Sequence, residues 1–336
     1  MDLLINAYGT RIRSRGERIV LAFPDGKKQE YPARRVEKII ILRPSSISTG
    51  AVQLALEHDI DIVYLGSFGK PIGRIFPSHP KGLAELRRAQ LAFAHSPQAL
   101  RLAKQFVQGK SQNQIAYLRR LQATGQADRS PEIIQAEALL KTVDLIPDNA
   151  HGRMQLFGVE GFIADQYFAG LKKLYRFPGR HPRGRDRFNS ALNYGYGMLY
   201  NEVERACLYV GLDPYLGLYH SERYGKPALV LDLVEEFRVP VVDSTIFPLF
   251  ISKTLTGIAN YARDSSGRYT LSPEGKRQVV AAVYQRLNQP VAWVGRRIPV
   301  KTVIDYQARA ISWIFLGRRK TYSPFPYAAV LNTDAQ

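Results

Sequence analysis

The hydrophobic period of the chain changes near residue 77, and this change limits the fold more than any other feature. Before it, short apolar segments such as LLINAYG, RIVLAF and KIIILR are separated by turn residues at Ser14 to Gly16 and Pro24 to Gly26. This pattern predicts short strands joined by hairpins. One helix is expected over STGAVQLALEHD, followed by the apolar strand IDIVYLG.

After the loop-like sequence SHPKG at 78–82, apolar residues recur at helical spacing. Helices are predicted over 83–108, 111–124, 131–144, 153–174, 188–210, 244–264, 273–288 and 300–317. The expected fold is therefore α+β, with a small β-sandwich-like domain at 1–77 and a larger all-α domain at 85–325. Residues 78–84 form the predicted linker, and 326–336 a C-terminal tail.

Three side chains that can bind a hard metal lie within sixteen residues: His220, Asp232 and Glu235. Asp232 and Glu235 are three apart in a segment that should open a helix, so their carboxylates project from one face. Their neighbours are apolar, and an unpaired charge near a dry interior is costly unless a cation relieves it. The alternative is that both acids only favour a helix N-terminus and that His220 is an ordinary loop residue.

A further acid, Glu160, lies within a helical stripe of apolar residues. The stripe consists of Leu156, Ile163, Ala164, Tyr167, Leu171 and Leu174. A buried glutamate is usually protonated, paired with arginine or bound to a metal. The sequence around Glu160 leaves all three explanations open.

Four strings in this region resemble the CRISPR-associated adaptation integrase family. They are GVEGFIADQYF at 158–168, RDRFNSALNYGYGMLYNEVERA at 185–206, GLDPYLGLYH at 211–220 and LVLDLVEEFR at 229–238. Their order and spacing are more specific than any single motif. Weaker similarity extends to YLGSFGKPIGRIFP at 64–77, LRRAQ at 86–90 and YQARAISWIFLGRRKTYSPF at 306–325, and so covers nearly the whole chain.

The resemblance implies that Glu160, His220 and Glu235 hold one divalent metal, Mg²⁺ or Mn²⁺. Asp232 matches a further family acid beside the metal, in a supporting role. The implied activity is that of a DNA endonuclease and integrase, which inserts captured DNA segments into a CRISPR array by transesterification. Implied partners are DNA, a second copy of the chain bound through the β domains, and a small ferredoxin-like companion protein.

The net charge also favours a nucleic-acid partner. With 47 Lys and Arg against 29 Asp and Glu, the formal charge is +18, which is typical of proteins that bind polyanions. The segment 172–187 is rich in Pro and Gly and is expected to be a loop. Four of its arginines, Arg180, Arg183, Arg185 and Arg187, are candidate DNA ligands. The alternative is a loop whose charges only keep it solvated.

Other classes of protein find little support. The single Cys207 excludes an internal disulfide and a cysteine-based zinc site, and neither GxxxxGK[ST] nor GxGxxG after a strand is present. A nucleophilic Ser221 paired with His220 lacks an evident orienting acid. Without an apolar run of eighteen residues or a signal pattern, a cytoplasmic protein is expected. The rival function is a non-catalytic DNA-binding scaffold, in which Glu160, His220 and Glu235 need not meet.

Overall fold

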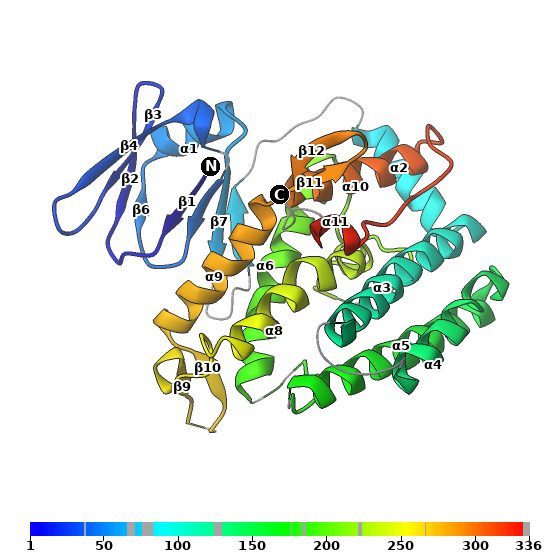
Figure 1. Ribbon diagram of the computed structural model, residues 1–336. Helices are drawn as coiled ribbons and strands as arrows, with labels where there is room; N and C mark the ends of the chain where they lie inside the picture. The colour runs from blue at the N-terminus through cyan, green and yellow to red at the C-terminus, as the bar shows by residue number, and fades with distance from the viewer. Residues whose placement is uncertain are drawn as a thin grey trace. The chain divides into compact units, whose positions relative to one another are not determined.

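The computed structural model describes residues 1–36, 38–65, 71–75, 83–123, 130–175, 177–182, 184, 186–220, 224–265 and 267–331. The chain divides into two compact units, Met1–His79 and Pro80–Gln336. Figure 1 shows strands in the first unit and long helices in the second. The predicted α+β class is confirmed. Most of the predicted linker at 78–84 lies outside the described residues.

The N-terminal unit contains two four-stranded sheets. One has the order β1-β5-β7-β8, and the other has the order β4-β3-β2-β6. The first sheet comprises β1 (Asp2–Ile5), β5 (Lys38–Ile41), β7 (Asp61–Leu65) and β8 (Pro71–Ile75). The second sheet comprises β4 (Lys28–Pro32), β3 (Arg18–Ala22), β2 (Arg11–Arg15) and β6 (Ser46–Ile47). Helix α1 (Thr49–Glu57) begins after Ser48, whose hydroxyl accepts the N–H of Ala51 at 3.2 Å.

Hairpins account for only part of this unit. The antiparallel pairs β2–β3 and β3–β4 match the expectation, but β1, β5 and β7 pair in parallel. All four residues of β5 are buried. Its last three residues are isoleucines, and a continuous apolar run of this kind suits the centre of a parallel sheet, which is covered on both faces. Ile5, Ile12, Ile19, Ile39 and Ile62 are fully buried and form part of the core of the unit.

The second unit is built mainly from long helices. They are α2 (Leu83–Ala94), α3 (Pro97–Ala123), α4 (Pro131–Leu140), α5 (Ala150–Tyr175), α6 (Arg187–Tyr209), α7 (Ala228–Leu233), α8 (Ser244–Ile251), α9 (Pro273–Asn288), α10 (Val300–Phe315) and α11 (Ala328–Leu331). The predicted helix at 83–108 is interrupted before Pro97, and its second part continues into the next predicted helix as the 27-residue α3. Proline at the first helical position favours this new start.

Two short hairpins interrupt the helices. The prediction of a helix over 244–264 is wrong after Ile251, because β9 (Tyr261–Arg263) pairs with β10 (Tyr269–Leu271) through a turn at Gly267, whose φ is +75°. A second hairpin joins β11 (Pro290–Trp293) to β12 (Arg296–Pro299). The predicted C-terminal tail is partly packed, since Tyr327 and Val330 are buried.

Helices α3, α5 and α6 carry much of the core around the candidate site. Leu156, Ile163, Tyr167 and Leu171 on α5 are buried as their spacing predicts, whereas Leu174 is 46% exposed. Figure 1 shows α3 and α5 running alongside one another. Among the helices in the described ranges, none is long and apolar enough to cross a membrane.

Candidate metal centre

Two regions far apart in the sequence supply the acids of the candidate site. Glu160 lies in α5, Asp232 lies in α7, and Glu235 lies in the 3₁₀ helix η3 (Val234–Phe237) that directly follows α7. The chain then forms the π-helical segment η4 (Arg238–Asp243). Wide turns of this kind occur often at functional sites. Here the turn places the guanidinium of Arg238 against Glu235, with Nη2 2.9 Å from Oε1.

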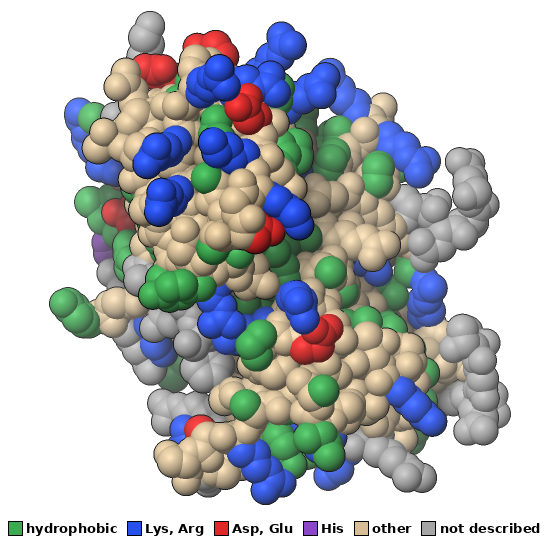
Figure 2. Space-filling model, turned by 90° about the vertical axis from the view of Figure 1, so that its left-hand side faces the viewer, with side chains coloured by type: hydrophobic (Ala, Val, Ile, Leu, Met, Phe, Trp, Pro, Cys, Tyr) green, Lys and Arg blue, Asp and Glu red, His purple; other side chains and the backbone are tan. Residues whose placement is uncertain are grey.

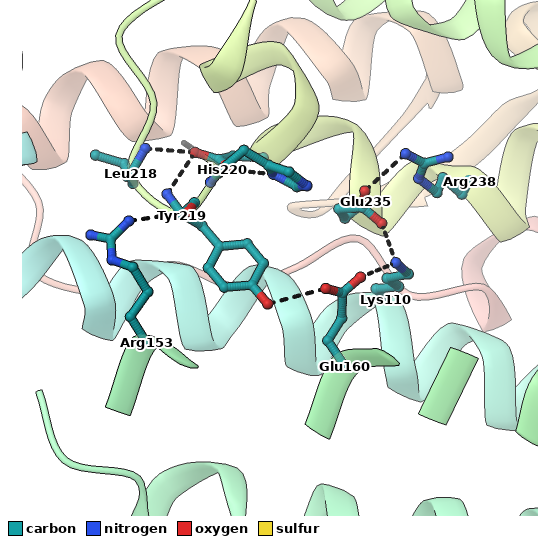
Figure 3. A network of polar contacts seen from close by, with 9 residues as sticks. Lys110, Arg153, Glu160, Leu218, Tyr219, His220, Glu235 and Arg238 are labelled. Carbon is teal, nitrogen blue, oxygen red and sulfur yellow. Dashed lines mark hydrogen bonds and ion pairs between the residues drawn. The ribbon is translucent and has the colours of Figure 1, made fainter. Parts of the chain in front are cut away.

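Lys110 on α3 joins the two glutamates (Figure 3). Its Nζ donates to Oε1 of Glu160 and lies 2.7 Å from Oε2 of Glu235. The side chains of Lys110, Glu160 and Glu235 are only 11%, 15% and 4% exposed, respectively. The structure therefore brings Glu160 and Glu235 to opposite sides of one ammonium group. Of the explanations for a buried glutamate, pairing with a cation holds here, although the partner is lysine rather than arginine.

The charges of this cluster stabilise one another. Burial alone would raise the pKa of Glu235, but the positive charges of Arg238 and Lys110 outweigh it and lower that pKa to about 2. Burial would also lower the pKa of Lys110, yet the charges of Glu235 and Glu160 raise it. The carboxylate of Glu235 is thus ionised, the form in which it binds a metal ion.

Asp232 organises the loop that carries His220. Its Oδ2 accepts the backbone N–H groups of Leu218 at 2.6 Å and Tyr219 at 3.0 Å, and its Oδ1 accepts that of His220 at 2.9 Å. Oδ1 also lies 2.7 Å from His220 Nδ1. Asp232 is fully buried and these four contacts occupy its oxygens. This arrangement fits the supporting role that the resemblance implied for Asp232.

The same contacts fix the orientation of His220. With Nδ1 directed at Asp232, the imidazole has Nε2 left for another ligand. Burial lowers the pKa of His220, but the hydrogen bond and the charge of Asp232 outweigh it and raise the pKa above its ordinary value. Gly217 permits the close packing of this loop, because a Cβ there would lie 2.6 Å from Cβ of Ala228.

Tyr219 connects the histidine loop to α5. Its hydroxyl donates to Oε2 of Glu160 at 3.1 Å, and its carbonyl oxygen accepts Nη1 of Arg153 at 3.1 Å. The contacts run from His220 through the adjacent Tyr219 to Glu160, and then through Lys110 to Glu235 (Figure 3). All three predicted metal ligands are therefore connected in one network.

The donor set suits a divalent ion, since two carboxylates and one imidazole are ligands for Mn²⁺ and Mg²⁺. Oε2 of Glu235 is buried and has the Lys110 ammonium as its neighbour. Within the part of the chain that the structure describes, no three His, Cys, Asp or Glu side chains already form a metal cluster. Lys110 lies between the two glutamates in this arrangement, so a metal shared by both must displace it from at least one of them.

Sequence reasoning missed Lys110, although a signal for it was present. On α3 it lies four and three residues after Phe106 and Val107, and three and four before Asn113 and Gln114. All four of these residues are buried. A buried lysine in such a stripe predicts a buried acid as its partner, and the buried Glu160 likewise predicts a cation. Lys110 and Glu160 are fifty residues apart in the sequence, and each is the kind of partner that the other requires.

Two of the four predicted DNA-binding arginines are bound within the protein. Arg180 donates to Asn189 Oδ1 at 3.0 Å and lies over the ring of Tyr196, and Arg187 donates to the carbonyl of Thr256 at 2.8 Å. Arg183 and Arg185 lie outside the described residues. Lys and Arg outnumber Asp and Glu on the face drawn in Figure 2.

Comparisons with known proteins identify the family and agree with the fold. The family described as CRISPR associated protein Cas1 matches residues 3–285. A relative from Thermus thermophilus, named CRISPR-associated endonuclease Cas1 1, is 34% identical over 97% of this chain and 99% of its own. A relative of the same name from Archaeoglobus fulgidus is 29% identical over 95% of this chain and 98% of its own.

Solved structures show the same fold. A casposase bound to its integration product has a TM-score of 0.81 and 24% identity over 96% of this chain and 92% of its own. A Cas1 protein from Thermotoga maritima has a TM-score of 0.78 and 18% identity over 97% and 100%. Fold and site thus define an α+β protein with an acid–histidine centre in its helical unit. The chain belongs to the CRISPR-associated Cas1 family, because that family matches it over most of its length.

Proposed function

We propose that the chain is a divalent-metal-dependent DNA endonuclease and integrase, which inserts captured DNA segments into a CRISPR array. One observation carries the proposal: the carboxylates of Glu160 and Glu235 converge on the single ammonium of Lys110, beside a histidine that Asp232 orients. Two carboxylates buried side by side need a cation between them. The relatives named CRISPR-associated endonuclease support the reaction class.

In this proposal, Glu160, Glu235 and His220 Nε2 hold Mg²⁺ or Mn²⁺. A bound divalent ion polarises phosphoryl oxygens and activates a hydroxyl group or water. A DNA 3′-hydroxyl that attacks a phosphodiester forms a new P–O bond while the bond from phosphorus to the target strand's 3′-oxygen breaks, and that oxygen leaves as a hydroxyl. Water in place of the 3′-hydroxyl would cleave the strand. Asp232 would keep His220 in the tautomer with a proton on Nδ1, and Lys110 would give up at least one carboxylate contact to a bound ion. Arg238 continues to neutralise Glu235.

The proposed partners follow the family. The unit at 1–77 would join two copies of the chain, the helical unit at 85–325 would act on DNA, and a small ferredoxin-like protein would complete the assembly. A solved assembly titled Cas6-RT-Cas1--Cas2 complex contains a chain whose fold resembles this one, with a TM-score of 0.75. The two sheets of the N-terminal unit have edge strands, which offer hydrogen-bonding groups to a partner. Light scattering tests dimer formation directly.

The decisive experiment is strand joining into supercoiled DNA that carries a repeat array, in Mn²⁺, in Mg²⁺ and in EDTA. We expect metal-dependent joined products with wild type and none with Glu160→Ala. Asp165→Ala is the matched control, because Asp165 is exposed on the same helix. Full joining by Glu160→Ala, or joining in EDTA, would reject the metal mechanism.

A non-catalytic DNA-binding scaffold is the second candidate. The observation in its favour is that Lys110 and Arg238 already neutralise the buried acids without a metal. Both functions require salt-sensitive DNA binding, so binding does not separate them. Calorimetric titration with Mn²⁺ separates the two functions. A scaffold should not bind Mn²⁺, whereas the enzyme should bind it and lose that binding in Glu235→Ala.

A further inference from the structure

Phe157 is a large apolar side chain exposed beside the candidate metal centre. It lies three residues before Glu160 on α5 and is 38% exposed. One face of its ring is covered by Tyr219, with centroids 4.2 Å apart and planes 19° from parallel. The ring of His220 lies 6.4 Å away, nearly perpendicular to it. Any strand that reaches His220 therefore passes close to Phe157.

The support beneath Phe157 is rigid. Tyr219 is 1% exposed, and its hydroxyl and carbonyl are bonded to Glu160 and Arg153. Because Tyr219 is fixed at both ends, it holds the Phe157 ring in place. The exposed part of Phe157 is therefore the ring face that points away from Tyr219. Ordering this aromatic surface costs little further conformational entropy when a ligand binds.

Two glycines leave the backbone of α5 uncovered near Phe157. Gly158 and Gly161 lie inside α5, and a Cβ added to either would meet nothing within 4 Å. Packing therefore does not explain these glycines, which cost helix stability relative to alanine. Glycine does permit close approach of a ligand to the backbone. Gly161 lies one turn after Phe157 and next to Glu160, where the proposed substrate binds, whereas Gly158 lines the groove that also contains Phe162.

We propose that the open face of Phe157 stacks on a nucleobase of the DNA strand whose phosphate reaches the metal centre. The inference rests on the proposed function and adds a base-stacking subsite to it. Arg153 lies four residues before Phe157 on α5 and donates to Tyr219, which stacks on Phe157. A flat aromatic face beside a cation is the combination by which proteins bind single-stranded nucleic acid without reading its sequence. An apolar protein partner has no need of this cation.

The test measures stacking without catalysis, in metal-free buffer. A short duplex with a single-stranded 3′ end carries 2-aminopurine, or an abasic residue, at successive positions near that end. The proteins are wild type, Phe157→Leu, Phe157→Trp and Phe162→Leu. Leucine keeps the apolar volume but lacks a π face. Phe162→Leu is the matched control, because Phe162 is 42% exposed on the same helix and instead lines a groove with Leu139 and Leu145.

In wild type, Phe157→Trp and Phe162→Leu, we expect binding to quench 2-aminopurine at one position, and an abasic residue there to weaken binding about tenfold. In Phe157→Leu the quenching should disappear, and the abasic residue should cost less than about twofold. Equal abasic losses in wild type and Phe157→Leu, or unchanged quenching, would overturn the inference. This test involves neither metal nor strand joining, so its result is independent of the proposed function. If the protein fails to join DNA but still shows quenching that depends on Phe157, the proposed function is rejected and the stacking inference stands.

Discussion

Nδ1 of His220 lies 2.7 Å from Oδ1 of Asp232, and the Asp232 carboxylate also accepts three consecutive backbone N–H groups of the histidine loop. A single buried acid thus fixes both the path of the loop and the direction of the imidazole. Asp232 and His220 are twelve residues apart, so their pairing depends on the turn between Gly217 and α7. The candidate metal centre is therefore organised by a residue that has no need to bind a metal itself.

The first prediction is that Asp232→Asn impairs metal use while retaining DNA binding. The new amide NH₂ must face either backbone N–H donors or the imidazole N–H, so at least one contact is lost. Such supporting contacts typically change metal affinity or activity by about 10- to 100-fold. Joining rates measured against Mn²⁺ concentration should shift to higher metal, with partial recovery in excess Mn²⁺. A curve identical to that of the control Asp165→Asn would contradict this role.

The second prediction concerns the ligands. Alanine at Glu160, His220 or Glu235 should abolish joining and leave DNA affinity within about twofold, because affinity comes from distributed phosphate contacts. Glu235→Ala should also destabilise the protein by about 3–5 kcal/mol, since it leaves Lys110 and Arg238 as buried charges without this partner. Anisotropy titrations and urea melts measure both effects. Retained joining in any of the three variants removes that residue from the ligand set.

The third prediction is that Lys110→Met separates metal affinity from stability. Methionine removes the ammonium from between Glu160 and Glu235, so the metal-free protein should be less stable than wild type. Added Mn²⁺ should bind more tightly and raise its melting temperature more than that of wild type. Differential scanning calorimetry with and without Mn²⁺ tests this. Lys172→Met, at an exposed position of α5, is the control; equal metal-induced shifts in the two variants would show that Lys110 does not compete with the ion.

The fourth prediction is that DNA affinity falls steeply with salt, and that the four candidate arginines Arg180, Arg183, Arg185 and Arg187 do not contribute equally. Log K should drop with log salt by about 0.9 for each phosphate contact on duplex DNA. Arg187 lies over the rings of Tyr261 and Tyr269 and donates to Thr256. Arg187→Gln should therefore lower stability by about 1 kcal/mol. Arg183→Gln with Arg185→Gln should reduce the salt slope without affecting the melt. An unchanged slope in that double variant would exclude both residues from the phosphate contacts.

Much of the site follows from local sequence patterns, and the rest depends on tertiary contacts. The burial of Glu160 follows from the helical spacing of its apolar neighbours. The proximity of Asp232 and His220 follows from their short separation in the sequence. Lys110 could not be assigned in this way, because its partners are 50 and 125 residues away and the choice between buried lysine, arginine and metal depends on packing. Strand β9 at Tyr261 could not be predicted from local sequence either, because it depends on pairing with β10 through the turn at Gly267.

The last prediction concerns the start of α5, which positions Glu160. Asp148 accepts Nζ of Lys104 at 2.8 Å and Nε of Arg101 at 2.5 Å, and so ties the residues before α5 to α3. Burial would raise the pKa of Asp148, but the hydrogen bonds from Arg101 and Lys104 outweigh it and lower the pKa below its ordinary value. The side chain is 23% exposed, so part of this interaction is screened by solvent.

Because the pKa of Asp148 is lower in the folded chain, the unfolded chain binds more protons in the window between the folded pKa and the ordinary value near 3.8. The stabilisation is therefore complete at neutral pH and is lost as the pH falls through that window. Asp148→Asn should reduce the free energy of unfolding by about 1–2 kcal/mol at pH 7, and the difference from wild type should shrink progressively below about pH 4. Urea melts of both proteins, with the exposed Asp165→Asn as control, measure this difference. A difference that stays constant down to the lowest pH at which wild type folds would mean that Asp148 acts through packing rather than charge.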